Sequence, residues 1–132
     1  MDYEIFSARE WILMQRKVVV KKSKIQGLGT FAKRHTPKAQ VVGYYKGKVF
    51  EGGDDTFVHC WCDGKGNEID ILVDGPLRYM NHSSEPNCEI SREDTDSEGR
   101  HRSVIVSICD IIKGEELTRY YSDYFEKLVK KS

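Results

Sequence analysis

Apolar residues in this sequence occur in short runs that are rich in β-branched and aromatic side chains and are separated by glycine-containing turns. Short runs of this composition, bounded by turn residues, are typical of β-strands. No internal repeat or linker-like stretch is visible. We therefore expect one mostly β fold, with residues 41–50 forming either a strand pair or a single bulged strand. The other expected strands lie at residues 18–20, 57–62, 68–73, 88–91, 104–108 and 117–121.

Helix signals occur near the two ends of the chain. Ser7 and Glu10 form a capping-box pattern ahead of an apolar segment, which predicts a short N-terminal helix. The tail has apolar residues three and four positions after Phe125, which indicates a short amphipathic helix. Residues 93–99 are acidic and lack an apolar anchor, so we expect them to form a mobile loop.

The formal net charge is zero, but the charges are unevenly distributed. Residues 1–50 hold eleven Lys/Arg against three Asp/Glu, whereas residues 51–132 hold ten against eighteen. Zero net charge does not indicate a general polyanion binder. The seven acidic residues and single Lys between residues 51 and 74 suit either a surface for a basic partner or a set of solvated strand faces.

A chain of 132 residues is long enough to form one domain with its own core. Its N-terminus has no basic-then-apolar signal pattern, and no apolar run approaches the roughly 20 residues that span a bilayer. We therefore expect an intracellular protein whose four cysteines are reduced thiols.

Two of these cysteines, Cys60 and Cys62, flank a tryptophan and follow His59, and this group could be half of a zinc site. Structural zinc sites usually take cysteine pairs that are separated by two to four residues. A strand with alternating faces is therefore the preferred interpretation. A small β-rich structural or metal-binding module is kept as a competing hypothesis.

Residues 78–88, Arg-Tyr-Met-Asn-His-Ser-Ser-Glu-Pro-Asn-Cys, form a polar stretch that cannot supply much of a core. Pro86 disfavours helix at the preceding residue. Asn81 and His82 carry polar groups of fixed hydrogen-bonding geometry, so the stretch is a candidate cofactor-binding segment.

Two further features could approach a ligand. Gly27 and Gly29 allow close backbone approach, although a Gly-x-Gly pair alone is weak evidence for a binding site. Tyr44 and Tyr45 are adjacent in an expected strand, so their side chains point to opposite faces and one of them can reach a pocket.

Four motifs in chain order resemble those of the SET-domain protein lysine methyltransferases, over residues 18–121. Residues 27–31, Gly-Leu-Gly-Thr-Phe, resemble the Gly-x-Gly loop of the family, and residues 45–47, Tyr-Lys-Gly, resemble its Tyr-x-Gly strand. Residues 78–88 are similar to its Asn-His-Ser signature, and residues 114–121, Gly-Glu-Glu-Leu-Thr-Arg-Tyr-Tyr, resemble its C-terminal signature.

This resemblance implies several small β-sheets with a knot-like crossing of two C-terminal segments, residues 78–88 and 116–121. It also implies methyl transfer from S-adenosyl-L-methionine to the ε-amine of a protein lysine. The reaction is an in-line displacement that needs an aligned, neutral amine and acceptors around the methyl group. A narrow apolar channel and a nearby sulfonium both disfavour the ammonium form of lysine.

The same resemblance implies roles for individual residues. Tyr121 would be the catalytic tyrosine that orients the amine, and Tyr45 a second pocket tyrosine, with Tyr120 and Tyr124 as weaker catalytic candidates. We expect the His82 imidazole to bond across the crossing segments more than to a cofactor. The implied cofactor-binding residues are Gly27, Leu28, Gly29, Asn81, His82 and Phe125, and the implied substrate channel contains Tyr45, Ile90, Arg119 and Tyr120.

The chain departs from the family pattern in three ways. Cys88 matches a position that often joins three later cysteines around zinc, but no cysteine follows Cys109, so a minimal form without that closing element and without metal is expected. The helix around Phe125 would close the site instead. Arg119 and Tyr120 replace an aromatic or small residue and an aspartate, and Arg119 could either limit methylation or contact the substrate.

We therefore expect a single SET domain over residues 1–132, divided into a helical extension (1–16), a core (17–121) and a closing segment (122–132). The expected substrate is a basic, lysine-bearing protein such as a histone, and neither nucleic acid nor membrane is an expected partner. The chain would act as a monomer or homodimer, in the nucleus or on chromatin if it is eukaryotic or viral and otherwise in the cytoplasm. A catalytically inactive SET-like binding module is the alternative.

Overall fold

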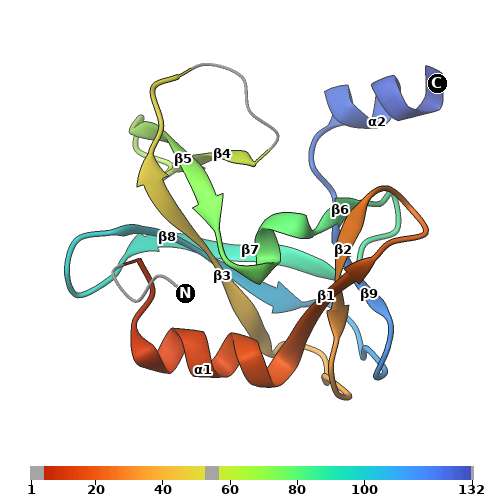
Figure 1. Cartoon of the computed structure of the whole chain (residues 1–132). Helices are drawn as coiled ribbons and strands as arrows, with labels where there is room; N and C mark the ends of the chain where they lie inside the picture. Colours follow the sequence, from red (N-terminus) through yellow and green to blue (C-terminus); the bar gives the residue numbers. More distant parts are fainter. Residues whose placement is uncertain (1–4, 53–56, 132) are drawn as a thin grey trace.

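The computed structural model describes residues 5–52 and 57–131 and consists mainly of β-strands (Figure 1). Five strands form one sheet in the order β4-β5-β3-β8-β7, and four form another in the order β1-β2-β9-β6. The predicted mostly β fold with several small sheets is confirmed. The strands are β1 (Val18–Lys22), β2 (Leu28–Ala32), β3 (Val41–Val49), β4 (Val58–Cys62), β5 (Glu68–Asp74), β6 (Asn81–His82), β7 (Cys88–Thr95), β8 (His101–Ser107) and β9 (Glu116–Arg119).

Both predicted helices are present, as α1 (Ala8–Lys17) and α2 (Asp123–Lys131), and a 3-10 turn, η1 (Pro76–Tyr79), lies between β5 and β6. The capping box forms as expected, because Ser7 Oγ accepts from the Glu10 N–H at 3.1 Å and Glu10 Oε1 accepts from the Ser7 N–H at 2.9 Å. Within the described residues, no helix has the length and apolar character required to cross a membrane.

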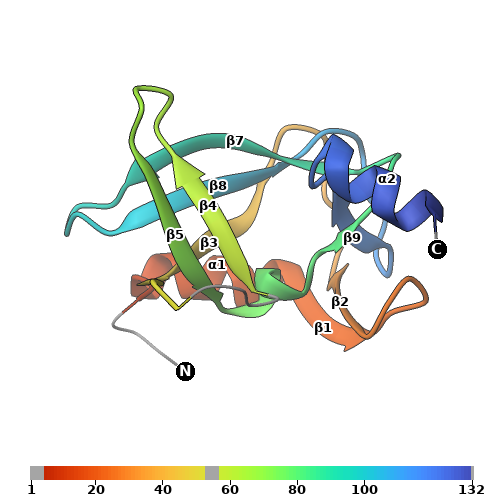
Figure 2. The ribbon, with the colours of Figure 1, turned by 90° about the horizontal axis from the view of Figure 1, so that it is seen from above.

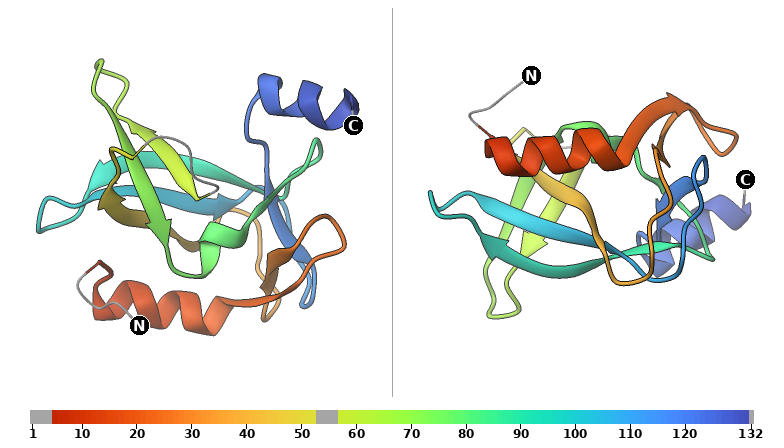
Figure 3. Two further views of the ribbon diagram at one scale, coloured as in Figure 1. Left: turned by 45° about the horizontal axis from the view of Figure 1, so that its top comes forward. Right: turned by 90° about the horizontal axis from the view of Figure 1, so that it is seen from below.

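Helix α1 packs against β3. It is seen below the sheets in Figure 1 and along the bottom of the left-hand view in Figure 3. Residues 41–49 form one strand with a register shift between Val41 and Gly43, so the bulged-strand alternative is confirmed. A Cβ on Gly43 would lie 2.5 Å from Leu77 of η1 and 2.9 Å from Met14 of α1. Glycine is needed here because both elements press against the strand that carries Tyr45.

The predicted hairpin between residues 57 and 73 is confirmed as the antiparallel pair β4 and β5. Its turn is held by Asp63, whose carboxylate accepts from the Lys65 N–H at 2.7 Å and from Asn67 Nδ2 at 2.6 Å. A turn was also expected at residues 52–55, of which residues 53–55 lie outside the described part of the chain.

Two segments far apart in sequence lie side by side at the expected crossing. Strands β6 and β9 are parallel neighbours, with His82 opposite Arg119. Asn87 fastens them, because its Nδ2 donates to the Glu116 carbonyl at 2.8 Å and its Oδ1 accepts from the Thr118 N–H at 2.8 Å. Residues 83–87 therefore form a turn that fixes β6 against β9.

The expectation of an acidic loop at residues 93–99 is wrong for residues 93–95, which belong to β7, whereas residues 96–99 do form the turn between β7 and β8. Strand β7 continues to Thr95, and two of the acidic residues form ion pairs with buried or half-buried cations. Asp94 Oδ1 lies 2.9 Å from Arg102 Nε, and Asp96 Oδ2 lies 2.7 Å from Lys46 Nζ. The stretch is ordered by these charges rather than by apolar anchors.

The later strands complete the two sheets. Val104 and Ile105 of β8 are both fully buried, so both faces of this interior strand are covered. Strand β9 ends at Arg119 rather than at residue 121. Tyr120 and Tyr121 therefore lie in the segment that connects β9 to α2.

Candidate active site

Tyr45 lies on β3, two residues after the bulge, and is 4 % exposed. Its hydroxyl accepts a hydrogen bond from Arg119 Nε at 2.9 Å and approaches Met80 Sδ at 3.9 Å. Burial raises the pKa of this hydroxyl, and the nearby Arg119 charge opposes that shift. Tyr45 is therefore a protonated phenol at neutral pH.

Tyr121 follows β9 and faces the same region. Its hydroxyl donates to the Met80 carbonyl, and its backbone N–H donates to His82 Nδ1 at 3.0 Å. Burial raises the pKa of Tyr121 to about 12. The parallel pairing of β6 with β9 produces this arrangement, because it brings Met80 and His82 alongside the residues that follow β9.

The guanidinium of Arg119 lies between the two tyrosines. Its Cζ is 5.2 Å from the ring centroid of Tyr45 and 4.9 Å from that of Tyr121, within the range of cation–π contacts. Its Nη1 also donates to the Tyr120 carbonyl at 3.3 Å. The guanidinium of Arg119 thus contacts both of the predicted catalytic tyrosines.

These residues line a pocket of about 580 Å³ that lies between the β4–β5 hairpin and α2. Both elements are on the same side of the molecule, as Figures 1 and 2 show. The pocket brings together four residues that the sequence predicted for the site: Tyr45, Ile90, Arg119 and Tyr121. Its other lining residues include Phe57, Val58, His59, Cys60, Val73, Arg78, Met80, Ser122, Tyr124, Phe125 and Leu128.

The charged residues that line this pocket within the described part of the chain are all cationic. Arg78 and Arg119 line it, whereas no Asp or Glu does so within residues 5–52 and 57–131. His59, which also lines it, contacts Ser103 Oγ at 3.1 Å and Glu93 Oε2 at 3.3 Å. Burial, together with the Arg119 charge, lowers the pKa of His59, which favours its neutral form.

A second polar cluster forms where residues 23–29 meet β6 and β9. Asn81 Nδ2 lies 2.8 Å from Glu116 Oε2, 3.1 Å from Ser23 Oγ and 3.2 Å from the Leu28 carbonyl. A Cβ on Gly29 would lie 2.4 Å from Glu116 Oε2. Glycine is therefore required because the Glu116 carboxylate occupies the space beside the loop.

Helix α2 is joined to this region through aromatic contacts. The rings of Phe125 and His82 are 4.9 Å apart, and those of Phe125 and Tyr121 are 4.8 Å apart. His82 Nε2 also bonds to the Glu126 carboxylate, and this bond holds the pKa of Glu126 below its usual range. The His82 imidazole thus connects β6, the segment after β9 and α2, as expected of a residue that bonds across the crossing.

Comparison with known proteins agrees with this arrangement. The family described as "SET domain" matches residues 27–122. The chain belongs to the SET-domain family. Over 130 residues it is 33% identical to histone-lysine N-methyltransferase 2D of Homo sapiens, an alignment that covers 89% of this chain and 2% of that protein. It is 33% identical over 127 residues to histone-lysine N-methyltransferase trr of Drosophila melanogaster, covering 86% and 5% respectively.

The chain therefore spans only a few per cent of the length of these curated relatives. Among solved structures, a Plasmodium falciparum protein described as a candidate histone methyltransferase superposes with a TM-score of 0.66, covering 83% of this chain and 96% of that one at 18% identity. At this level of identity the structural match supports the SET fold alone.

The SET-domain motifs do not bring every predicted residue to the pocket. The Tyr120 hydroxyl donates to Asp123 Oδ1 at 2.6 Å, a bond that raises the pKa of Tyr120 to about 12, and its side chain is not part of the pocket lining. Tyr124 lines the pocket but is 74% exposed. Gly27, Leu28 and Gly29 lie in the polar cluster with Asn81 rather than in the tyrosine pocket.

Sequence reasoning missed three residues of this SET domain. Glu116 stands inside the quoted C-terminal signature, so its motif position was a usable signal. Ser23, whose Oγ donates to Glu116 at 2.7 Å, lies outside the quoted motifs. Arg78, the first residue of the 78–88 motif, bonds to Tyr79 at 2.5 Å and also lines the pocket.

The cysteines give the competing metal hypothesis no support. Cys60 and Cys62 are exposed free thiols, and His59 is engaged by Ser103 and Glu93. In the described part of the chain, no group of three or more His, Cys, Asp or Glu residues could hold a metal ion. Cys88 is a buried thiol, and burial raises its pKa to about 12.

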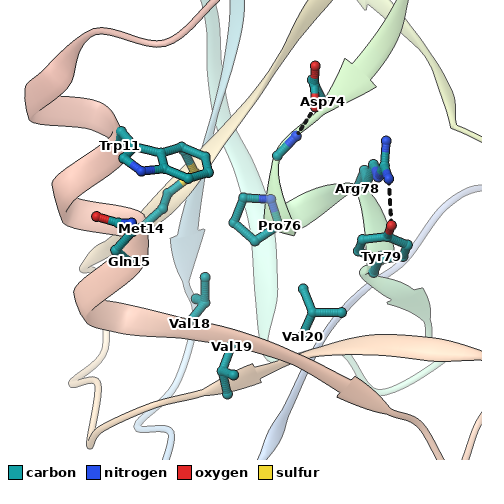
Figure 4. Close-up of a pocket in the computed structure, with 11 residues that line it drawn as sticks. Trp11, Met14, Gln15, Val18, Val19, Val20, Asp74, Pro76, Arg78 and Tyr79 are labelled. Atoms are coloured by element: carbon teal, nitrogen blue, oxygen red, sulfur yellow. Dashed lines mark hydrogen bonds between the residues drawn. The ribbon is translucent and has the colours of Figure 1, made fainter. Parts of the chain in front are cut away.

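A second cavity, of about 290 Å³, lies between α1, β1 and η1 (Figure 4). Figure 4 shows Trp11 and Met14 of α1 facing Pro76, with the valines of β1 below them. None of the predicted site residues lines this cavity. Its lining is mostly apolar, so it is a gap in the packing of α1 and not a second active site.

Proposed function

We propose that this SET domain is a protein lysine methyltransferase that uses S-adenosyl-L-methionine and acts on a basic protein, with histone tails as the first candidate. The observation that carries the proposal is the convergence of Tyr45 and Tyr121 on one pocket beside Met80. Phenol hydroxyls and a backbone carbonyl are acceptors and donors without a competing charge, as the transfer of a methyl group to an amine requires. The names of the relatives support the same reaction class.

The residues around Asn81 suit the methyl donor. The amino-acid part of the donor carries an ammonium, for which this cluster offers two acceptors: the Asn81 side-chain oxygen and the Glu116 carboxylate, which also accepts from Ser23 and Asn81. We assign the amino-acid part of the donor to this cluster and its adenine to the backbone of His82 and the ring of Phe125. When bound, the donor supplies an electrophilic methyl group and a positive sulfonium.

The proteins that we expect to be methylated carry lysines in basic segments. The β4–β5 hairpin beside the pocket carries Asp63, Glu68 and Asp70, which would attract such a segment. If the substrate is a histone, the protein acts in the nucleus or on chromatin.

The test is methyl transfer from labelled S-adenosyl-L-methionine to core histones and to a cell lysate, with the modified lysine located by mass spectrometry. Tyr121→Phe removes the hydroxyl that bonds to Met80 and should lower kcat by about tenfold or more, with the affinity for the donor little changed. Tyr44→Phe changes the neighbouring tyrosine on β3, which does not line the pocket, and serves as the matched control. Equal rates for Tyr121→Phe and wild type would remove Tyr121 from the mechanism.

The alternative function is a SET-like binding module without catalysis. One observation favours it: Arg119 already stands between the two tyrosines. This alternative predicts that the wild-type protein binds the donor but transfers no methyl group to any histone or lysate protein. Label that appears only on non-histone proteins would instead remove the histone assignment and leave the lysine methyltransferase proposal intact.

A further inference from the structure

The position of Arg119 poses a chemical problem for a site that receives lysine. Its guanidinium is stacked on the rings of Tyr45 and Tyr121 and donates to the Tyr45 hydroxyl at 2.9 Å. A target lysine normally carries a positive charge, because its ammonium has a pKa of about 10.4. Both cations would therefore be drawn to the same pair of phenols.

The surroundings of the pocket provide no described carboxylate to balance a second cation. The titratable and charged groups that line it are Tyr45 of β3, His59 and Cys60 of β4, Arg78 of η1, Arg119 of β9, and Tyr121 and Tyr124 of the C-terminal segment. Three acids lie behind the lining: Glu93 bonds to His59 and Ser103, Glu116 bonds to Ser23 and Asn81, and Asp70 of β5 acts on His59 only through its charge. An entering ammonium would meet two guanidinium groups.

The neighbours of Arg119 already respond to its charge. Burial is the main reason why the pKa of His59 is lowered, and Arg119 is the next cause. The Arg119 charge also acts to lower the pKa values of Tyr45 and Tyr121 against the effect of burial. A like charge within about 4–6 Å of an amine disfavours its protonated form in the same way.

We propose that Arg119 is a further catalytic residue, whose guanidinium keeps the entering lysine ε-amine in its neutral, nucleophilic form. This inference rests on the proposed function. The lysine ammonium gives its proton to solvent as it enters, and the nitrogen lone pair then forms the N–C bond to the methyl group. The C–S bond breaks with its electron pair remaining on sulfur, so the products are S-adenosylhomocysteine and a methylated ammonium.

The ring contacts give Arg119 a second effect in this step. The guanidinium donates to the Tyr45 oxygen, and the Tyr45 O–H hydrogen points to Met80 Sδ at 3.9 Å, a weak acceptor that an entering amine can replace. A neutral amine can accept this hydrogen or donate to the phenol, whereas an ammonium can only donate. Selection of the neutral amine therefore follows from hydrogen-bonding geometry as well as from charge.

The first experiment is the pH dependence of kcat at a saturating concentration of a labelled histone peptide, measured for wild type, Arg119→Met and Arg119→Lys, because kcat reports the pKa of the lysine in the bound complex. Arg119→Met keeps an apolar chain but removes the charge, and we expect its acid limb to move up by about one pH unit. Its rate at the alkaline plateau should stay within about threefold of wild type. Arg119→Lys should keep the acid limb of wild type, and Lys113→Met is an exposed control.

A substrate with a less basic amine sharpens this test. A peptide in which the target lysine is replaced by S-aminoethylcysteine has a weaker base, because the sulfur withdraws electrons from the amine. It should restore the activity of Arg119→Met at neutral pH and change wild type much less. If Arg119→Met loses the same fraction of the wild-type rate at every pH, Arg119 has a purely structural role. If the rate of Arg119→Met rises at every pH, Arg119 blocks the entry of lysine. Either result overturns the proposal.

A binding measurement separates this proposal from the proposed function. Calorimetry in buffers of different ionisation enthalpy counts the protons released when N-acetyl-lysine methylamide binds in the presence of S-adenosylhomocysteine. Wild type should release close to one proton per bound ligand at about pH 8, and Arg119→Met clearly fewer. A wild-type protein that binds the ligand without proton release overturns the role of Arg119 even if histones are methylated. Absence of methyl transfer with intact proton release overturns only the proposed function.

Discussion

Two buried or half-buried cations on either side of Tyr45 have opposite surroundings. Lys46, the next residue along β3, is fully buried, and its Nζ lies 2.7 Å from both Glu10 Oε1 and Asp96 Oδ2. Arg119, which contacts the Tyr45 ring and hydroxyl, has no carboxylate within ion-pair distance among the described residues. We call Lys46 the balanced cation, because carboxylates pair with it, and Arg119 the unbalanced cation, because none does among the described residues. A balanced cation stabilises the fold, whereas an unbalanced one can act on a charge that enters the pocket.

The balanced side extends into a network. Arg102 Nη1 lies 2.8 Å from Glu10 Oε2, and Arg102 Nε lies 2.9 Å from Asp94 Oδ1. The network therefore ties α1 to β3 and to the β7–β8 hairpin. Breaking a buried ion pair from one side costs much more than the net contribution of the pair, because a charge is left unpaired.

The largest expected effect comes from removing the balanced cation. Lys46→Met should lower the free energy of unfolding by about 3 kcal/mol, because buried Glu10 and half-buried Asp96 would each lose a cation and keep only Arg102 and Arg100 as partners. Denaturant unfolding measures the change, and Lys48→Met on the exposed end of the same strand should change it by less than about 0.5 kcal/mol. Equal effects of the two substitutions would remove the contrast between the cations.

The second effect is a dependence of stability on pH. Burial alone would raise the pKa values of Glu10 and Asp96, but hydrogen bonds from Lys46 and other donors outweigh it and hold both below their usual range. The unfolded chain therefore binds protons first as the pH falls. The resulting stability is complete above about pH 5 and is lost at lower pH, by roughly 1–2 kcal/mol between about pH 6 and about pH 3.

Urea unfolding at a series of pH values checks this dependence. The Lys46→Met protein is the control, because without the lysine the folded-state pKa values of both acids should rise toward those of the unfolded chain. Its stability should then change less on acidification than that of wild type. A steeper acid loss in the variant would contradict the assigned role of the lysine.

The smallest effect on stability is expected on the unbalanced side. Arg119→Met removes two hydrogen bonds and two ring contacts but leaves no carboxylate unpaired, so the free energy of unfolding should change by about 1 kcal/mol or less. Thermal unfolding measures it. A loss as large as that of Lys46→Met would show that Arg119 is mainly structural.

Local sequence patterns predicted a large part of the fold. The capping box at Ser7, the hairpin of β4 and β5, and the tail helix all depend on residues within a few positions of one another. The order of the motifs predicted the crossing through resemblance to relatives, because periodicity carries no signal for it. Tyr45 and Tyr121 were found in the same way.

The remaining features depend on distant partners. Nothing near Lys46 indicates that it is buried, because its partners Glu10 and Asp96 are 36 and 50 positions away. Residues 93–95 were expected to be part of a loop for the same reason. They form the end of β7, and the partner of Asp94 there is Arg102 on the neighbouring strand. Arg119 was recognised as unusual from its motif position, but its direction between two rings depends on how β9 passes β3, which the sequence does not specify.

The attachment of α1 through Glu10 has a practical consequence for protein production. The family match begins at residue 27, after α1 and β1, so a fragment cut there would retain both pocket tyrosines. It would also strip Lys46 of one carboxylate and expose the packed surface around Gly43 that Met14 covers. Expression fragments of this protein should therefore start upstream of Ser7, so that they include the helix and its cap together with the SET domain.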